Sequence, residues 1–276
     1  MANTTKKKTG HIVLFIVLCL LSVIIAFPFI WMVLSSFKKS EEFYYLVPKL
    51  LPESFMLYNF KELIGKWNFL SYYKNSIIVT TFQVLTNLVI VLLSGYGFAH
   101  YNFKGKSFFF ILILSSTMIP WVATIIPLYI LANNLHLIDT LAGLMIPGMA
   151  NAFNIFLARN FMTSIPTAYI ESARLEGASE KRIFASIILP SVKPLISVIT
   201  IQKMIDSWNA FQWPLLCVNS ERLRTIPLAI AKLSSQYYDS YNLKMAAATL
   251  AIIPVLIIYV IFQKNFVEGI SLSGVK

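Results

Sequence analysis

The chain has 276 residues, of which 57% are hydrophobic and 13% are charged, and its formal net charge at pH 7 is +11. The charged share is about half of that usual in soluble domains, and a soluble fold of this size could not bury so much apolar surface. The Lys and Arg residues are scattered between apolar runs, a pattern that fits anionic lipid headgroups better than a nucleic-acid partner. The sequence therefore predicts an integral membrane protein with one domain, 1–276, and no appended catalytic domain.

Six segments are apolar over the roughly 20 residues that a membrane-spanning helix needs. They are about 11–37, 72–99, 107–132, 140–163, 183–217 and 245–266. The two-residue alternation of a membrane barrel does not run long enough in any of them. The predicted fold class is therefore an all-α membrane protein with six transmembrane helices.

Proline occurs inside many of these spans. Each proline removes a backbone donor and bends its helix unless a neighbouring group compensates, so kinked helices are expected. Kinks favour a bundle that opens, although static bundles also contain them. The prolines in question are Pro28, Pro120, Pro127, Pro147, Pro190, Pro194, Pro214 and Pro254.

The fourth span, 140–163, contains two amides, Asn151 and Asn154. Within a membrane an amide either lines a polar pathway or forms hydrogen bonds between helices. Both interpretations stay open, and we keep the two residues as candidates for a solute pathway.

A short polar insert, about 164–182, separates the fourth span from the fifth. Residues 167–175 favour helix, Pro166 precedes them where proline is tolerated, and Gly177 follows where a C-cap glycine would end the helix. A second helix is expected to begin near Ser179, a good N-cap. The pattern predicts a helix–turn–helix at the membrane surface, although an ordinary charged loop fits the composition equally well.

The residues within the insert are suited to contact with another protein. Glu171, Arg174 and Glu176 give a polar face for salt links, and the small residues Ser172 and Ala173 allow a partner surface to approach closely. A membrane protein that passes force to a soluble partner needs such a helix outside the bilayer.

The fifth span carries the charged residues Lys203 and Asp206, which lie three apart and so share a helix face. A charge inside a span costs about 2.5–3.5 kcal/mol by insertion scales and usually faces a partner or an aqueous path. The two could pair with each other. They could also form the wall of a solute path, because amides, a carboxylate and aromatic rings together suit a sugar. The neighbouring candidates for that wall are Trp208, Asn209, Gln212 and Trp213.

Basic residues cluster mostly on one side of the predicted bundle: Lys6–Lys8, Lys104, Lys106, Arg159, Arg174, Lys181, Arg182, Lys264 and Lys276. The short loop 133–139 on the opposite side has no Lys or Arg. The positive-inside rule then places both termini and the insert in the cytoplasm. The loops 38–71 and 219–243 carry basic residues on the outer side, but longer loops count less in this rule.

Other catalytic or metal-binding patterns are missing from the sequence. His11, His100 and His136 lie at span ends or in loops without ligand spacing, so no metal site is predicted. Cys19 and Cys217 fall in apolar stretches and indicate small core residues. The chain has no P-loop and no nucleophile elbow, so it is not predicted to be an enzyme.

The insert resembles the EAA loop of ABC-importer permeases, a Glu-Ala-Ala triplet followed by a glycine and, further on, by Ile-x-Leu-Pro. The matching residues are Glu171, Ala173, Gly177, Ile187, Leu189 and Pro190. The chain departs from the pattern at Ser172, where the family usually has alanine, and at Glu176, where aspartate is commoner. Both departures are mild.

Two further stretches are similar to the carbohydrate-uptake branch of this family, and in particular to the smaller permease subunit of the maltose-type (multiple-sugar) transporter. They are 206–215, Asp-Ser-Trp-Asn-Ala-Phe-Gln-Trp-Pro-Leu, and the glycine-containing ending 269–276. The first span and the residues after it, 29–43, also look like this branch. The likeness extends over nearly the whole chain.

The resemblance implies a type I ABC-importer permease bundle in the cytoplasmic membrane of a bacterium. Residues 168–178 would be a coupling helix that docks on an ATPase subunit, with Glu171 and Gly177 as its main residues. It further implies a second homologous permease, two copies of the ABC ATPase that use ATP and Mg²⁺, and an extracellular solute-binding protein that delivers a carbohydrate, with an oligosaccharide as the expected form. This chain itself would bind no cofactor.

Two alternatives stay open beside this interpretation. One is an ABC importer for a non-sugar solute. The other is a stand-alone ion-coupled transporter or an intramembrane enzyme, which fits less well because Asp206 is the only clear acidic residue within a span.

Overall fold

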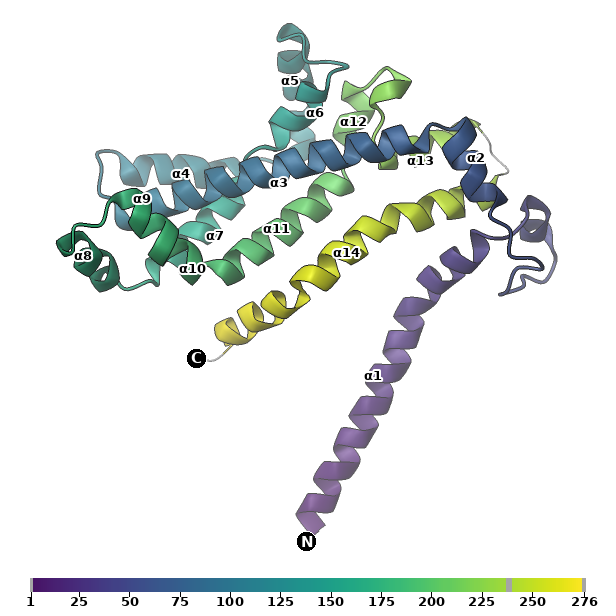
Figure 1. The fold of residues 1–276 in the computed structure, drawn as a ribbon, viewed down its shortest axis with the longest axis horizontal. Coiled ribbons are helices and arrows are strands. Elements are labelled where there is room, and N and C mark those ends of the chain that lie inside the picture. Colours follow the sequence, from purple (N-terminus) through teal and green to yellow (C-terminus); the bar gives the residue numbers. More distant parts are fainter. Residues whose placement is uncertain (1, 237–239, 275–276) are drawn as a thin grey trace. The chain divides into compact units, whose positions relative to one another are not determined.

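The computed structural model describes residues 2–236 and 240–274, with side chains for 11–233 and 240–263. In these segments the regular structure is helical, and no strand occurs in them (Figure 1). This confirms the predicted all-α class. Lys6–Lys8, Lys264 and the ending 269–276 lie outside the described side chains.

The helical elements, in chain order, are α1 (Ala2–Ser35), η1 (Ser40–Tyr44), α2 (Tyr58–Lys66), α3 (Phe69–His100), α4 (Lys106–Ser116), α5 (Trp121–Asn134), α6 (Leu141–Met145), η2 (Ile146–Gly148), α7 (Ala152–Thr163), α8 (Thr167–Leu175), α9 (Glu180–Ile183), η3 (Phe184–Ile188), α10 (Leu189–Ser191), α11 (Lys193–Trp208), α12 (Gln212–Cys217), η4 (Glu221–Leu223), α13 (Ile226–Gln236) and α14 (Tyr241–Gly274). The element η3 is a π-helix, and the other three η elements are 3₁₀-helices.

Three helical segments of the described chain are long and apolar enough to cross a membrane alone: His11–Ser35, Phe69–His100 and Tyr241–Gln263. Three helix pairs reach that length only together, and each pair is bent at a short break. The pairs are α4 with α5, bent by 100°, α6 and η2 with α7, bent by 41°, and the segment α9–α10 with α11, bent by 76°. Counting each pair as one span gives up to six, at the six predicted positions.

The bends occur at only some of the predicted prolines. Pro120 lies in the break between α4 and α5, and Pro147 lies in η2. Pro190 and Pro194 flank the break at Val192. Pro120 is the N-cap of α5 and Pro194 lies in the first turn of α11, where the missing N–H removes no intrahelical bond. Pro147 and Pro190 lie inside the helical segments Leu141–Gly148 and Glu180–Ser191, before the breaks. The helix continues through Pro28, Pro127 and Pro254.

The predicted fifth span, 183–217, is too long at its C-terminal end. The helix α11 ends at Trp208, and α12 begins a separate short helix at Gln212. Polar Asn209 ends the longer helix, and Pro214 is accommodated in the first turn of the shorter one. The stretch 206–215 therefore forms a corner in which two helix ends meet.

The described residues form two compact units. The first comprises the chain up to Phe69 together with Ile230–Ile252, and the second comprises Leu70–Ala229 and the chain from Ile253 onward. Buried polar groups order the first unit. Nδ2 of Asn59 donates to the carbonyl oxygens of Ser36 and Lys38 at 2.8 and 2.9 Å, and its Oδ1 accepts from Nδ2 of Asn242 at 2.7 Å. The loop after α1 is thus fixed by side chains that satisfy its backbone.

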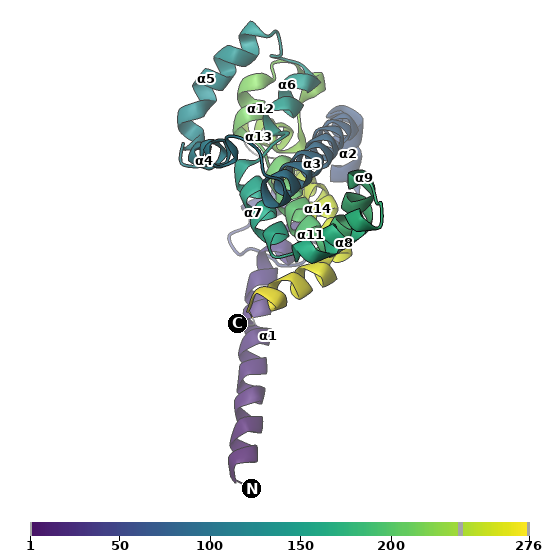
Figure 2. The ribbon, with the colours of Figure 1, turned by 90° about the vertical axis from the view of Figure 1, so that its left-hand side faces the viewer.

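The second unit is built around α3. Its main apolar core joins Val91, Leu92 and Tyr96 of α3 to Ile170 of α8 and Ile183 of α9, with further members from α7, η3 and α11. Figures 1 and 2 show α8 and α9 beside the C-terminal end of α3. This packing holds the insert against the end of a long, continuous helix.

Asp139 links two turns of the second unit, the turn before α6 and the turn after α12. Its Oδ1 accepts hydrogen bonds from the backbone N–H of Asn219 at 3.0 Å, and from the N–H and hydroxyl of Ser220 at 2.8 and 2.9 Å. The Ser220 N–H contributes most to holding the pKa of the Asp139 carboxyl below its usual range. Hydrogen bonds to the ionised form stabilise that form.

Acidification is therefore expected to weaken this link. A carboxyl with a depressed folded pKa stabilises the fold above its unfolded pKa, about 3.9, and loses that contribution as the pH falls through the folded pKa. We expect Asp139→Asn to lower the unfolding midpoint in detergent by a few degrees at pH 7, and by less at pH 3. A difference between wild type and variant that is equal at both pH values would contradict this assignment.

Candidate functional site

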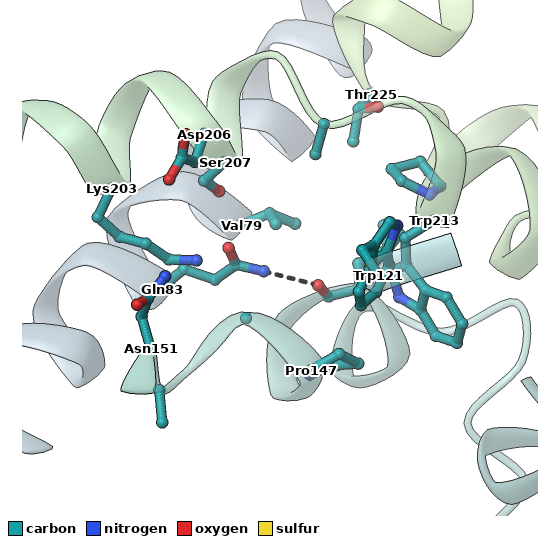
Figure 3. A pocket seen from close by; sticks show the side chains of 15 residues that line it. Val79, Gln83, Trp121, Pro147, Asn151, Lys203, Asp206, Ser207, Trp213 and Thr225 are labelled. Atoms are coloured by element: carbon teal, nitrogen blue, oxygen red, sulfur yellow. Dashed lines mark hydrogen bonds between the residues drawn. The ribbon is translucent and has the colours of Figure 1, made fainter. Parts of the chain in front are cut away.

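A cavity of about 630 Å³ lies within the second unit, at the corner where α11 ends. Its walls come from α3, α5, the segment from α6 to the start of α7, α11, α12 and the residue before α13 (Figure 3). The lining residues are Val79, Gln83, Trp121, Leu144, Pro147, Gly148, Ala150, Asn151, Lys203, Asp206, Ser207, Ala210, Trp213, Pro214 and Thr225. Most of them are apolar, and a few polar groups converge on the space, which is the usual composition of a small-molecule site.

Lys203 and Asp206 reach into this cavity from α11 (Figure 3). The mutual ion pair considered as one alternative for them is not present, because no oxygen of Asp206 lies within 4.0 Å of the Lys203 amine in the described residues. Lys203 is buried, whereas Asp206 is exposed. Both charges therefore face the cavity without neutralising each other directly.

Gln83 of α3 faces these charges and is the best-anchored polar group of the wall. Its Nε2 donates to the carbonyl oxygen of Leu144 at 2.9 Å (Figure 3). A Cβ at Gly148 would run into the Gln83 side chain, so a glycine at this position leaves room for the amide.

Two smaller polar groups complete the wall. Ser207 donates its hydroxyl to Thr80 at 3.3 Å. The buried Oγ1 of Thr225 has no hydrogen-bond partner in the described structure. A buried hydroxyl without a partner costs free energy unless water or a ligand reaches it.

Two tryptophans give the cavity its aromatic surface. Trp213 is buried and donates its indole N–H to the carbonyl oxygen of Gly143 at 2.8 Å, which fixes the ring. Trp121, the first residue of α5, contributes a second, more exposed ring. Apolar ring faces beside amides and a carboxylate are the groups to which a sugar binds.

The other predicted pathway residues lie around the cavity. Asn151 lines it and also caps α7, since its Oδ1 accepts from the Asn154 N–H at 3.1 Å. Asn209 and Gln212 line an adjacent space of about 320 Å³ that shares Trp121, Ala210 and Trp213 with the main cavity.

Trp208 and Asn154 are placed differently. Trp208 is buried against Tyr73, with ring centroids 5.8 Å apart. Asn154 is buried and donates to Oδ1 of Asn87 on α3 at 3.2 Å, which is the interhelical hydrogen bond considered as its alternative role. Neither residue lines the main cavity.

Sequence reasoning missed Gln83, Ser207 and Thr225. Gln83 carried a usable signal, because amides within the predicted span 72–99 could line a pathway or bond between helices, as was considered for Asn151 and Asn154. No sequence signal pointed to Ser207 and Thr225, because their position in the cavity wall depends on how the chain turns after the end of α11. In the described residues no group of three His, Cys, Asp or Glu side chains could hold a metal ion.

The insert has the predicted helix–turn–helix form. The helix α8 covers Thr167–Leu175, as predicted, and ends in a left-handed turn at Gly177, with φ of +81°. The Gly177 N–H donates to the Arg174 carbonyl at 3.0 Å, and the Ala178 N–H donates to the Ala173 carbonyl at 2.9 Å. These are the two bonds of a Schellman cap, which glycine forms without strain.

The second helix of the insert also begins where predicted. The Ser179 hydroxyl accepts from the Arg182 N–H at 3.4 Å and so caps α9. A Cβ at Gly177 would find no other atom within 4 Å, so nothing in this unit makes the position sterically crowded.

The two sides of α8 differ sharply. Ile170 is 2% exposed in the core, and Ala173 packs partly against the same core. Leu175 is 90% exposed and Tyr169 is 63% exposed. Both small side chains were predicted to face a partner, but Ala173 packs against the core of its own unit, whereas Ser172 is exposed. The exposed large hydrophobic residues of α8 are Tyr169 and Leu175.

Residues 87–272 match the family described as the binding-protein-dependent transport system inner membrane component. This chain belongs to that family. The matched range contains the insert and every cavity residue except Val79 and Gln83. The resemblance read from the insert is thereby confirmed.

Several relatives that match most of this chain are named as permeases of sugar transport systems. The arabinooligosaccharides transport system permease protein AraQ of Bacillus subtilis (strain 168) is 33% identical over 267 residues, which cover 93% of this chain and 92% of that protein. The lactose transport system permease protein LacG of Rhizobium radiobacter is 28% identical over 276 residues, which cover all of both chains.

A solved structure shares the fold. It is a chain of a bacterial ABC transporter involved in the import of the acidic polysaccharide alginate, with a TM-score of 0.82 and 25% identity. The match covers 95% of this chain and 98% of that one. The fold of this chain is therefore shared by a chain of a bacterial ABC importer.

Proposed function

We propose that this chain is a permease subunit of an ABC importer that takes up a carbohydrate in the form of an oligosaccharide. The likeness to AraQ over 93% of this chain carries the proposal, and the relatives named for lactose and galactooligosaccharides support it. The chain is a membrane component without a P-loop, so ATP hydrolysis with Mg²⁺ belongs to a separate ATPase subunit.

The cavity beside α11 is assigned as this subunit's part of the solute path. Its carboxylate, amine and amides can exchange hydrogen bonds with sugar hydroxyls, and Trp121 and Trp213 offer ring faces to the apolar side of a sugar. Because Asp206 is exposed to the cavity and unpaired, its carboxylate is free to accept from a solute hydroxyl.

The helix α8 is assigned as the coupling helix. Its buried side anchors on the core of the second unit, while Glu171, Ser172, Leu175 and Glu176 face outward. Two copies of an ATPase would dock below this chain and a second, homologous permease, with both termini and the insert in the cytoplasm. An extracellular binding protein would deliver the sugar to the opposite side.

Replacing Asp206 by alanine is expected to raise the KM of sugar uptake by about tenfold. A hydrogen bond to a charged group is worth about 1.5–3 kcal/mol, and 1.4 kcal/mol corresponds to about a factor of ten. Uptake of labelled oligosaccharide into proteoliposomes that contain the whole complex measures the effect.

Ile205→Ala is the matched control. Ile205 precedes Asp206 on α11, is exposed, and does not line the cavity. We expect the control to keep the wild-type KM. Equal KM values for Asp206→Ala and Ile205→Ala would contradict the assignment of this cavity to the solute path.

A further inference from the structure

The carboxylate of Glu180, the first residue of α9, joins three segments of the second unit. Its Oε1 accepts from Nε of Arg174 on α8 at 2.7 Å. Its Oε2 accepts from the hydroxyl of Tyr96 on α3 at 3.2 Å, and from the hydroxyl of Tyr101, which follows α3 directly. One side chain thus ties both helices of the insert to the C-terminal end of α3.

Aromatic contacts reinforce this junction. The Tyr96 ring lies 5.5 Å from the Tyr101 ring and 5.3 Å from the Phe184 ring, measured between centroids. The Arg174 guanidinium lies 6.0 Å from the centroid of the Tyr101 ring. Burial and the hydrogen bond to Glu180 raise the pKa of the Tyr101 phenol, so this group stays a neutral donor at physiological pH.

The helix α3 connects this junction to the cavity without a break. It runs for 32 residues from Phe69 to His100, and Gln83, on the cavity wall, belongs to the same helix as Tyr96. At 1.5 Å per residue the two positions are about 20 Å apart along the axis.

The other route from the insert to the cavity is interrupted. After α9 the chain passes through the π-helical η3, and it then bends by 76° at the break before α11. Local π-helical turns and bends at proline are places where a helix yields. A displacement of the insert is therefore transmitted more faithfully by α3 than by α11.

We propose that Glu180 is a positioning residue that fastens the insert to α3, so that movement of the insert reaches the cavity through α3. This inference rests on the proposed docking of α8 on an ATPase. It goes further by naming the helix that moves with the insert and the side chain that makes the attachment. The α9–α11 segment then acts as the hinged side of the junction.

Distances between spin labels in the whole complex test the attachment directly. In a chain with Cys19→Ser and Cys217→Ala, one label pair uses the exposed positions Tyr169→Cys on α8 and Leu93→Cys on α3, and a second pair uses Tyr169→Cys and Ile205→Cys on α11. Pulsed electron paramagnetic resonance is recorded without nucleotide and after trapping with ATP and vanadate.

We expect the α8–α3 distance to stay constant between the two states while the α8–α11 distance changes. Adding Glu180→Ala should make the α8–α3 distance state-dependent. A change of the α8–α3 distance in the chain with Glu180 intact would overturn the inference but leave the docking proposal standing. If neither pair responds while ATP is hydrolysed, the docking proposal itself fails and the inference falls with it.

Uptake assays give an independent reading. Glu180→Ala is expected to lower sugar uptake about tenfold, while the ATPase still copurifies and hydrolyses ATP, so more ATP is consumed per sugar. Glu180→Gln should be intermediate, because an amide oxygen still accepts from a tyrosine. Lys181 follows Glu180 and is exposed, so Lys181→Ala serves as the control and should transport at the wild-type rate. Loss of the ATPase from Glu180→Ala would make Glu180 a docking residue and overturn the positioning role, as would wild-type uptake.

Discussion

Leu175→Asp is expected to release the ATPase subunit from the complex and to abolish sugar uptake. Leu175 ends α8 and exposes 90% of its surface, which places a large apolar side chain at the tip of a charged insert. Burying a leucine is worth about 1.5–3 kcal/mol, and a carboxylate placed in the same docked pocket would add a desolvation cost. The combined effect should weaken association by at least about a hundredfold, since each 1.4 kcal/mol is a factor of ten.

Copurification of the ATPase with the tagged chain, followed by an uptake assay, measures this effect. Leu175→Met is the matched control, because it keeps an apolar side chain of similar volume. It should retain both the ATPase and transport. An intact complex that transports normally with Leu175→Asp would show that the outer face of α8 is not the docking surface.

Gly177→Val is expected to lower uptake at least tenfold while leaving the chain in the membrane. Gly177 has φ of +81°, a conformation that costs an ordinary side chain about 1–2 kcal/mol and a β-branched one more. Keeping the Schellman cap would therefore strain the turn, and relieving the strain would turn α8 relative to α9. Either outcome misplaces the coupling surface.

Replacing Gly177 by asparagine or by aspartate distinguishes the effect of backbone strain on uptake from the effect of charge. Both tolerate the left-handed region better than valine does. No atom of the unit lies within 4 Å of the added Cβ, so Gly177→Asn should fold normally and keep most of the uptake. Gly177→Asp should lose uptake, because it adds a negative charge at the C-terminal end of α8 and at the docked surface. Normal transport by Gly177→Val and Gly177→Asp together would contradict the coupling role of this turn.

Local signals in the sequence predicted the helix ends within the insert, although composition alone left an ordinary charged loop open. Pro166, Gly177 and Ser179 mark the ends of α8 and α9 by rules that depend only on neighbouring residues, and the helix ends fall where those rules place them. The positions of the spans were also predictable, because about 20 apolar residues in a row leave few alternatives.

Features that depend on distant parts of the chain were not predictable. The sequence could not show that the chain bends at Pro120 and Val192 but continues as a helix through Pro28 and Pro254. Whether the missing N–H of a proline is compensated depends on neighbouring helices. The junction that Glu180 makes was not predicted, because its partner Tyr96 lies 84 residues away in the chain. The mutual ion pair considered for Lys203 and Asp206 was based on helical spacing alone. In the structure both side chains line the cavity and do not form that pair.

Transport by the purified assembly tests the central claim most directly. The chain is isolated from its own membranes in mild detergent, its companions are identified, and the preparation is reconstituted with labelled oligosaccharides and a solute-binding protein. We predict that a second multispanning chain and an ATPase copurify, and that sugar enters the liposomes only when ATP reaches the ATPase. Recovery of this chain alone, moving solute at full rate without ATP, would contradict the account.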